Sequence, residues 1–418
     1  MSGHGGTTAT SLVRVPGPVN AHSHAFHRIL RGRTHEGVAG GAGDFWTWRE
    51  QMYSAAGQLD PAGYGQLATA VFAEMAVTGW TAVGEFHYLH HGPGGTPYPD
   101  HDMELALARA ARAAGLRLVL LDTCYLSGGL DAHGRQVELN ETQRRFSDGD
   151  AAGWAVRHAG LRAALAAEEP ATAEQGAGLV TLGAAIHSVR AVPPAALEAV
   201  AGALEPGEPL HVHLSEQRAE NQACLADHGV TPTALLARHG LLTARLSAVH
   251  ATHLTGGDIA ALGKAGCSIV MCPTTEADLA DGIGPARELA DAGATIALGT
   301  DQHAVVDPYL EMRALEHGER LRTGTRGRFS PAELAAAARD GGLRSLGLPG
   351  NDDHLLVDGA SLRTAGSRTA QLPLTATAAD VHAVVINGIE VARNGIHARL
   401  GDPAALFRTF TTDHGELA

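Results

Sequence analysis

The sequence predicts an α/β protein whose main domain is a closed barrel of eight parallel strands, each followed by helical segments. Eight short apolar segments, typical of buried strands, alternate with alanine-rich stretches that are typical of helices. Polar residues follow several of these strands, and barrels of this kind carry their active sites at the carboxyl ends of the strands. With 418 residues, the chain is long enough for such a barrel and a smaller second domain.

The expected strands and helices follow one another in a regular order. The eight strands are expected at residues 18–24, 81–88, 117–125, 180–188, 209–215, 246–253, 268–273 and 295–301. The clearest helical patterns between them cover residues 62–78, 101–114, 195–204, 231–239 and 285–292. Because strands that alternate with helices form parallel sheets, and eight repeats allow the sheet to close, we assign residues 17–345 to a (β/α)8 barrel.

Two insertions and the two ends of the chain lie outside the regular repeats. Residues 25–60 follow the first strand and residues 126–178 follow the third, and we expect both to shape or cover the pocket. Residues 1–16 and 346–418 are assigned to a small β subdomain and tail. Since only 21 residues precede His22, we expect the C-terminal tail to form this subdomain incompletely, with an unpaired sheet edge.

Composition limits the partners and the compartment. The net charge of −14 argues against binding to nucleic acid or to anionic membranes, which attract basic surfaces. The sequence shows neither an apolar run of about 18 residues nor the basic flank and apolar core of a signal peptide, so we expect a soluble, cytoplasmic protein. The cysteines are far apart and mostly in apolar stretches, where we expect small buried side chains without disulfides: Cys124, Cys224, Cys267 and Cys272.

Histidines at the ends of strands predict a metal site. His22 and His24 close the first strand, and residues two apart on a strand face the same side, so both imidazoles point into the barrel mouth. His213 ends the fifth strand and Asp301 ends the eighth. Three nitrogens and one carboxylate suit a catalytic zinc ion with a position left for water, although iron or manganese could occupy the same ligands. A His-x-His motif alone is more often structural, but the ordered series favours a metal.

Several motifs resemble the deaminase branch of the amidohydrolase superfamily, in particular its members that act on formimino groups. They lie at residues 20–26 (NAHSHAF), 45–50 (FWTWRE), 84–91 (GEFHYLHH), 187–190 (HSVR), 250–253 (HATH) and 272–279 (CPTTEADL). The resemblance covers residues 17–345. The tryptophan–arginine and threonine–glutamate motifs are the most specific parts of it.

The resemblance implies a zinc-dependent hydrolysis of N-formimino-L-glutamate to N-formyl-L-glutamate and ammonia, a reaction of histidine degradation, in a homodimer. It implies that Asp301 accepts a proton from the attacking water and that His250 orients this water. Glu216, three residues after His213, would pass protons to the departing nitrogen. One zinc ion per subunit is expected, because two-metal relatives commonly use a modified lysine on the fourth strand, and the only lysine of this chain is Lys264.

A dicarboxylate substrate favours recognition by arginine. The resemblance assigns this task to Arg49, Tyr88 and Arg190, and Arg190 also follows the fourth strand on the catalytic face. His27 stands where many members have a glutamine near the substrate, and its charge would vary with pH. The role of His187 stays open.

A second metal site at His87, His90 and His91 is not expected. His87 and Tyr88 point to opposite faces of their strand, and the sequence indicates no carboxylate that completes a set. These histidines are expected to pack or to line the rim of the pocket.

Two alternatives remain open. One is a deaminase of the same superfamily that acts on a guanidino compound or on a purine- or pyrimidine-type heterocycle, whose pocket would need stacking aromatic rings but no pair of arginines. The other is a barrel that has lost catalysis and serves as a scaffold. Against the scaffold stands the presence of all the expected ligands and catalytic residues: His22, His24, His213, Glu216, His250 and Asp301.

Overall fold

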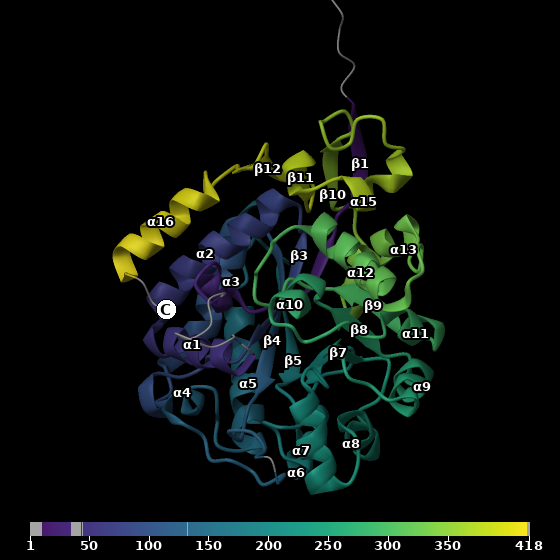
Figure 1. Ribbon diagram of the computed structural model, residues 1–418. Helices are drawn as coiled ribbons and strands as arrows, with labels where there is room; N and C mark the ends of the chain where they lie inside the picture. The colour runs from purple at the N-terminus through teal and green to yellow at the C-terminus, as the bar shows by residue number, and fades with distance from the viewer. Residues whose placement is uncertain (1–10, 35–42, 44, 132, 416–418) are drawn as a thin grey trace, which may run out of the picture.

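The computed structural model describes residues 11–34, 43, 45–131 and 133–415. At its centre lies an eight-stranded parallel sheet in the order β2-β3-β4-β5-β6-β7-β8-β9 (Figure 1). These strands are Val19–Ser23, Ala82–His87, Arg117–Cys124, Val180–Ile186, Leu210–Leu214, Leu246–His250, Ser268–Met271 and Thr295–Leu298. Each coincides with one of the strands expected from the sequence, and the predicted (β/α)8 barrel is confirmed.

The barrel closes where its first and last strands meet. Ser23 and Asp301 form a parallel bridge. The backbone N–H of Asp301 donates to the carbonyl of His22 at 3.0 Å, and the N–H of His24 donates to the carbonyl of Asp301 at 3.1 Å. Gly299 permits this approach, because a Cβ atom there would lie 2.8 Å from the Cβ of His22. The closure therefore holds three of the expected metal ligands in a fixed backbone frame.

Helices surround the barrel strands and the active-site end of the sheet. The helices of the expected repeats are present as α2 (Pro61–Thr78), α3 (Asp102–Ala114), α6 (Pro194–Gly202), α8 (Pro232–Arg238) and α11 (Ala286–Asp291). The others are α1 (Phe45–Gln58), α4 (Glu141–Arg144), α5 (Ala151–Ala167), α7 (Arg218–His228), α9 (Gly256–Ala265), α10 (Pro273–Asp278), α12 (Pro308–Thr323), α13 (Pro331–Ala336), α14 (Gly342–Ser345), α15 (Leu372–Thr375) and α16 (Pro403–His414).

Local sequence explains where several helices begin. The Asp60 side chain accepts the N–H of Gly63 at the start of α2, and Pro61 occupies the first turn, where its missing N–H costs nothing. Thr255 begins α9 and Ser330 begins α13 with capping boxes that satisfy two backbone donors each. Because these helices cover the outside of the barrel, every residue of β2, β3, β6, β7 and β8 is buried.

A second, antiparallel sheet has the order β1-β10-β11-β12-β13. Its strands are Leu12–Pro16, His354–Asp358, Val381–Ile386, Ile389–Arg393 and Ile396–His397. The tail forms a small β subdomain, as expected, and supplies four of its strands. Strand β1 was not predicted: it comes from the N-terminal side and pairs with β10 from Leu12 opposite Asp358 to Pro16 opposite His354. The alternation of apolar and polar residues in β1 is too short, next to Pro16, to predict a strand from the sequence. β1 thus occupies the edge that the sequence analysis left unpaired.

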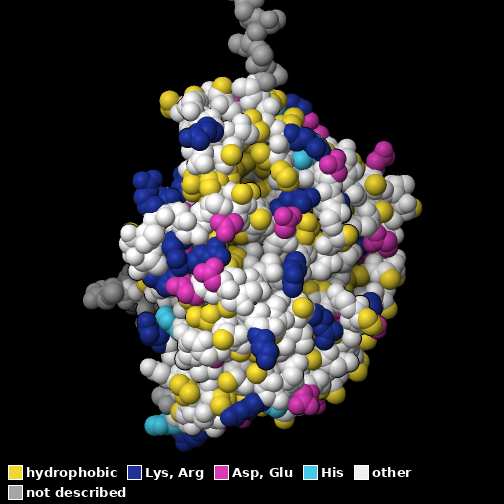
Figure 2. All heavy atoms as spheres, turned by 90° about the vertical axis from the view of Figure 1, so that its right-hand side faces the viewer, with side chains coloured by type: hydrophobic (Ala, Val, Ile, Leu, Met, Phe, Trp, Pro, Cys, Tyr) yellow, Lys and Arg dark blue, Asp and Glu magenta, His cyan; other side chains and the backbone are white. Residues whose placement is uncertain are grey.

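The subdomain lies at one end of the molecule, and α16 returns from it along α2 (Figure 1). Figure 2 looks onto the side formed by β1, α13 and α15 and shows hydrophobic side chains gathered in the upper part of this face. The four cysteines are buried and unpaired. Among the described helices, none combines the length and apolarity that crossing a membrane requires.

Candidate metal centre and active site

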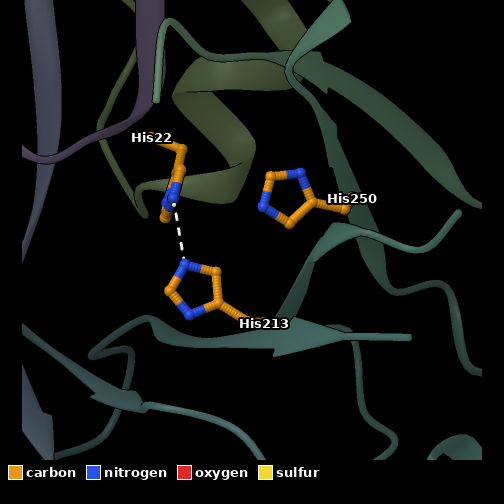
Figure 3. A group of neighbouring side chains, drawn as sticks. All are labelled: His22, His213 and His250. Carbon is orange, nitrogen blue, oxygen red and sulfur yellow. Dashed lines mark hydrogen bonds between the residues drawn. The ribbon is translucent and has the colours of Figure 1, made fainter. Parts of the chain in front are cut away.

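Four side chains converge at the carboxyl end of the barrel. Nε2 of His213 lies 3.2 Å from Nε2 of His22 and 3.3 Å from Nε2 of His24. Oδ1 of Asp301 lies 3.4 Å from Nε2 of His22 and 3.5 Å from Nε2 of His24. Figure 3 shows His22 and His213 directed toward each other, with His250 beside them. The structure therefore brings together all four residues expected to bind the metal.

The protonation of these histidines fits a bound cation. Nδ1 of His24 lies 2.8 Å from the carbonyl of Phe86, and Nδ1 of His213 lies 2.9 Å from the carbonyl of His187. A carbonyl only accepts hydrogen bonds, so each Nδ1 carries the proton. Burial lowers the pKa of His213 well below its usual value and that of His24 to about 3, which keeps both rings neutral.

Each neutral ring then presents the lone pair of Nε2 to the centre of the cluster. The lone pairs of two Nε2 atoms 3.3 Å apart repel each other. A metal cation bound to both nitrogens would remove this repulsion. Three imidazoles and one carboxylate are donors that suit zinc or a similar transition metal. The residues present thus fit the metal that the sequence predicts.

Backbone strain is concentrated at the same end of the barrel. Ser215, His250 and Asp301 have φ angles of 51°, 66° and 44°, in the left-handed region that favours glycine. Each such residue costs about 1–2 kcal/mol relative to ordinary backbone. Strain of this kind persists where the surrounding structure imposes it, and it clusters at active sites.

His250 lies among three carboxylates. Its Nε2 is 3.7 Å from Oε1 of Glu216 and 3.8 Å from Oδ2 of Asp301, and its Nδ1 is 3.5 Å from Oε1 of Glu276. Burial by itself would lower the pKa of His250, but the carboxylates outweigh it and raise the pKa to about 10. His250 lies close enough to His22 and His213 to share a metal with them. When its imidazole is protonated, His250 has no lone pair for a metal and is a hydrogen-bond donor beside the four expected ligands.

Glu276 was not predicted as a site residue. Its Oε1 accepts a hydrogen bond of 2.8 Å from the backbone N–H of Cys272, which fixes the carboxylate behind His250. The only signal in the sequence was its place in the motif at residues 272–279. Glu85, inside β3, was also missed: its carboxylate accepts from Ser23 Oγ at 2.5 Å and from the N–H of Ala25 at 2.6 Å. Glu85 thereby holds the segment around His24.

Aromatic and basic side chains line the pocket beside this cluster. Both long insertions contribute to its wall, as expected. The lining residues outside the metal cluster include His27, Phe45, Trp48, Arg49, Met52, Tyr53, Tyr88, Tyr125, Phe146, His187 and Arg190. The four residues expected to bind substrate, His27, Arg49, Tyr88 and Arg190, are all among them.

Arg190 keeps donors available for a ligand. Its Nη2 lies 3.9 Å from Oε2 of Glu216, and its Nε lies 3.8 Å from Oε2 of Glu220, both beyond hydrogen-bond distance. Burial would lower the pKa of Arg190, but Glu220 and Glu216 outweigh it and raise the pKa above its usual value. The guanidinium is therefore charged and held loosely between two carboxylates.

The other three expected substrate-binding residues are Arg49 and His27, in the insertion after β2, and Tyr88, which directly follows β3. The guanidinium of Arg49 stacks on Trp46 at 4.5 Å from the ring centroid. Nε2 of His27 lies 2.9 Å from the hydroxyl of Tyr88, so these two residues position each other. The ring of His187 packs against Tyr125 at 4.6 Å between centroids. His187 thus supports the wall with its ring and the metal ligand His213 with its carbonyl.

The expectation that no carboxylate accompanies His87 and His90 was wrong. Glu104 in α3 lies 2.7 Å from Nδ1 of His90 and 3.5 Å from Nε2 of His87. It reaches them from a neighbouring helix, which strand alternation could not reveal. Nε2 of His90 lies 2.9 Å from the carbonyl of Thr123, and Arg157 lies 3.1 Å from Glu104, so the cluster is a buried ion network without free ligand atoms on His90.

Comparison with known proteins identifies the family. Residues 13–354 match the model of the amidohydrolase family. The chain is 35% identical to the formimidoylglutamate deiminase of Pseudomonas aeruginosa over 96% of this chain and 89% of that protein. It is 30% identical to an 8-oxoguanine deaminase of the same organism over 89% and 80% of the two chains. A crystal structure of an amidohydrolase from Brucella melitensis superposes with a TM-score of 0.86, at 32% identity and 97% and 90% coverage.

The chain belongs to the amidohydrolase family, and it is a hydrolase that acts on C–N bonds. The resemblance stated from the motifs is confirmed, since a formimidoylglutamate deiminase matches nearly the whole chain. The metal-ligand cluster described above is consistent with the metal dependence of this family.

Proposed function

We propose that this protein is a zinc-dependent deiminase that hydrolyses N-formimino-L-glutamate to N-formyl-L-glutamate and ammonia in histidine degradation. Water adds its oxygen to the formimino carbon, the bond from this carbon to the terminal nitrogen breaks, and the nitrogen leaves as ammonia. Four side chains would hold the metal: His22, His24, His213 and Asp301. Zinc, when bound, supplies the Lewis acidity that makes water acidic enough to attack at neutral pH.

The chain's own residues carry the protons. Oδ1 of Asp301 faces His22 and His24, while Oδ2 faces His250 at 3.8 Å, so Oδ2 is placed to accept a proton from the attacking water. Burial raises the pKa of Glu216 above its usual range, which suits a group that first accepts and then donates a proton. Glu216 passes its proton to the departing nitrogen. The protonated His250, between Glu216 and Asp301, orients the water and stabilises negative charge on the oxygen.

The choice of substrate rests on two arginines in the pocket. Two guanidinium groups, Arg49 and Arg190, line the same pocket as the metal ligands. A substrate with two carboxylates and an amidine uses both guanidinium groups, and bidentate arginine contacts are the strongest recognition of a carboxylate. The 35% identity to a formimidoylglutamate deiminase supports the same choice.

The deciding experiment measures ammonia release from N-formimino-L-glutamate by the zinc-loaded protein and identifies the organic product by mass spectrometry. Ammonia with N-formyl-L-glutamate supports the proposal. Formamide with glutamate means that a different bond is cleaved. An absence of turnover with zinc bound favours a different substrate class.

A heterocycle deaminase is the second candidate, because the pocket wall carries several aromatic rings and an 8-oxoguanine deaminase is among the relatives. Stacked rings bind flat heterocycles, whereas two arginines give them no partner. Turnover of guanine-type substrates, tested in the same ammonia assay, separates the candidates. A homodimer and a cytoplasmic location remain part of the proposal.

A further inference from the structure

Tyr53, Tyr125 and Gln143 form a connected group in the pocket wall that the reaction above does not use. Nε2 of Gln143 lies 3.0 Å from the hydroxyl of Tyr53 and 2.9 Å from the hydroxyl of Tyr125. Gln143 is buried, and its Oε1 accepts the backbone N–H of Asn140 at 2.9 Å in the capping box of α4. This bond decides the orientation of the amide, so its NH2 group faces the two tyrosines and the backbone carbonyl of Gly128, which lies 3.2 Å from Nε2.

The hydroxyl hydrogens of the two tyrosines lack an acceptor on Gln143. An amide nitrogen accepts no hydrogen bond, so neither tyrosine can direct its own hydrogen to Gln143. The hydroxyls of Tyr53 and Tyr125 also interact with each other, so one of their two hydrogens can point between them. Among the residues that the structure describes, neither hydroxyl donates a hydrogen bond to an acceptor outside this group. Burial raises the pKa of Tyr125 well above its usual value, so its hydroxyl stays protonated at neutral pH.

Other donors in the same wall also lack acceptors. Nε1 of Trp48, Nε of Arg49 and Nε of Arg190 are buried without a hydrogen-bond partner in the described part of the chain. All three residues line the pocket together with Tyr53 and Tyr125. Buried donors that stay unpaired are costly. A wall of donors, two of them cationic, is complementary to an anion that only accepts.

We propose that Tyr53 and Tyr125, oriented by Gln143, donate a hydrogen bond to one carboxylate of the substrate and so help to select dicarboxylates. This inference rests on the proposed function and deepens it. Gln143 acts as a positioning residue, because its NH2 group lies within hydrogen-bond distance of both hydroxyls. The remaining O–H then points toward the ligand.

The test compares Tyr53→Phe and Tyr125→Phe with the metal-loaded wild type. The substrates are N-formimino-L-glutamate and two analogues that each lack one carboxylate, 4-(formimidoylamino)butanoate and N-formimino-L-2-aminobutanoate. Loss of a hydrogen bond to a charged group weakens binding by about tenfold to a hundredfold. We expect this loss in kcat/KM, mainly through KM, for the dicarboxylate and for one analogue, and little change for the analogue without the recognised carboxylate.

Tyr309→Phe is the control, since it removes a buried tyrosine hydroxyl that lies outside the active-site pocket. It should leave the kinetics unchanged. Gln143→Glu keeps an oxygen for Asn140 but replaces the amide donor with an acceptor, so it should reproduce the selective loss. Equal losses on all three substrates, or none, overturn the inference.

The inference and the proposed function can fail separately. If the wild type releases no ammonia from N-formimino-L-glutamate, the proposed reaction is wrong, and binding of N-formyl-L-glutamate by titration calorimetry becomes the test. Weaker binding by both phenylalanine variants then supports the carboxylate subsite. Equal binding, or no binding by the wild type, overturns it.

Discussion

Gly299→Ala should disturb the metal site through backbone contact alone. Gly299 follows β9 and approaches β2, and a Cβ atom there would lie 2.8 Å from the Cβ, 2.9 Å from the carbonyl oxygen and 3.0 Å from the nitrogen of His22. Favourable contacts between carbon atoms lie at about 3.5–4.0 Å. The two strands must therefore separate by several tenths of an ångström, and His22 moves with its strand.

The expected effect on stability is small and the effect on metal binding is large. Overpacking costs about 1–3 kcal/mol. For 418 residues the unfolding entropy is about 0.9 kcal/mol/K, so this cost lowers Tm by only about 1–3 °C. Disturbing the support of a metal ligand typically costs about tenfold to a hundredfold in metal affinity. We therefore expect weaker zinc binding at nearly unchanged melting.

The assay is zinc affinity by competition with a chelator, together with Tm and ammonia release. Gly202→Ala is the control, because Gly202 ends α6 and a Cβ atom there meets nothing within 4 Å. This control should be neutral or stabilising by at most about 1 kcal/mol. Wild-type zinc affinity in Gly299→Ala would show that the contact with His22 does not support the metal site.

Four further outcomes follow from the same structure. Chelation should lower Tm and added zinc should restore it, whereas His22→Ala should show no zinc-dependent rise; a rise equal to that of the wild type would contradict the ligand assignment. Glu276→Gln should lower kcat/KM about tenfold to a hundredfold without loss of zinc, because Glu276 supports His250; unchanged kinetics would exclude this role. Arg190→Ala should reduce activity on dicarboxylates more than on monocarboxylate amidines; a uniform loss would point to a structural role. Burial would lower the pKa of His158, but Asp122 and Glu208, each 2.9 Å away, outweigh it and raise this pKa from 6.5 to about 9. The ion pairs of His158 therefore stabilise the folded protein fully below pH 6.5, and this stabilisation is lost as the pH rises through about 9. His158→Gln should therefore lose less stability than the wild type over that interval, as measured by urea unfolding, and parallel curves would contradict it.

The sequence was most informative where chemistry and periodicity coincide. The strands that end in His24, His213 and His250 were found because apolar runs end in ligand-type side chains, and the fold confirms them. Part of the pocket wall could be predicted from the sequence for the same reason, since Arg190 follows a strand. These are features that neighbouring residues determine.

What the sequence could not reveal depends on contacts between distant segments. Glu276 supports His250 from helix α10, and Glu104 reaches His90 from helix α3. The role of Gln143 depends on two tyrosines from two other elements. β1 is a strand because β10 pairs with it, and a segment of five residues that ends in a proline carries too little pattern to predict that.

The meeting of β2 with the segment after β9 also sets when the enzyme can take up its metal during synthesis. His22 leaves the ribosome early, but Asp301 and the bridge to Ser23 exist only after three quarters of the chain has been made. At about 5–20 residues per second, the histidines wait roughly 15–60 seconds for their carboxylate partner. The complete set of candidate ligands therefore forms late, and a stalled or shortened chain would expose the histidines of β2 without it.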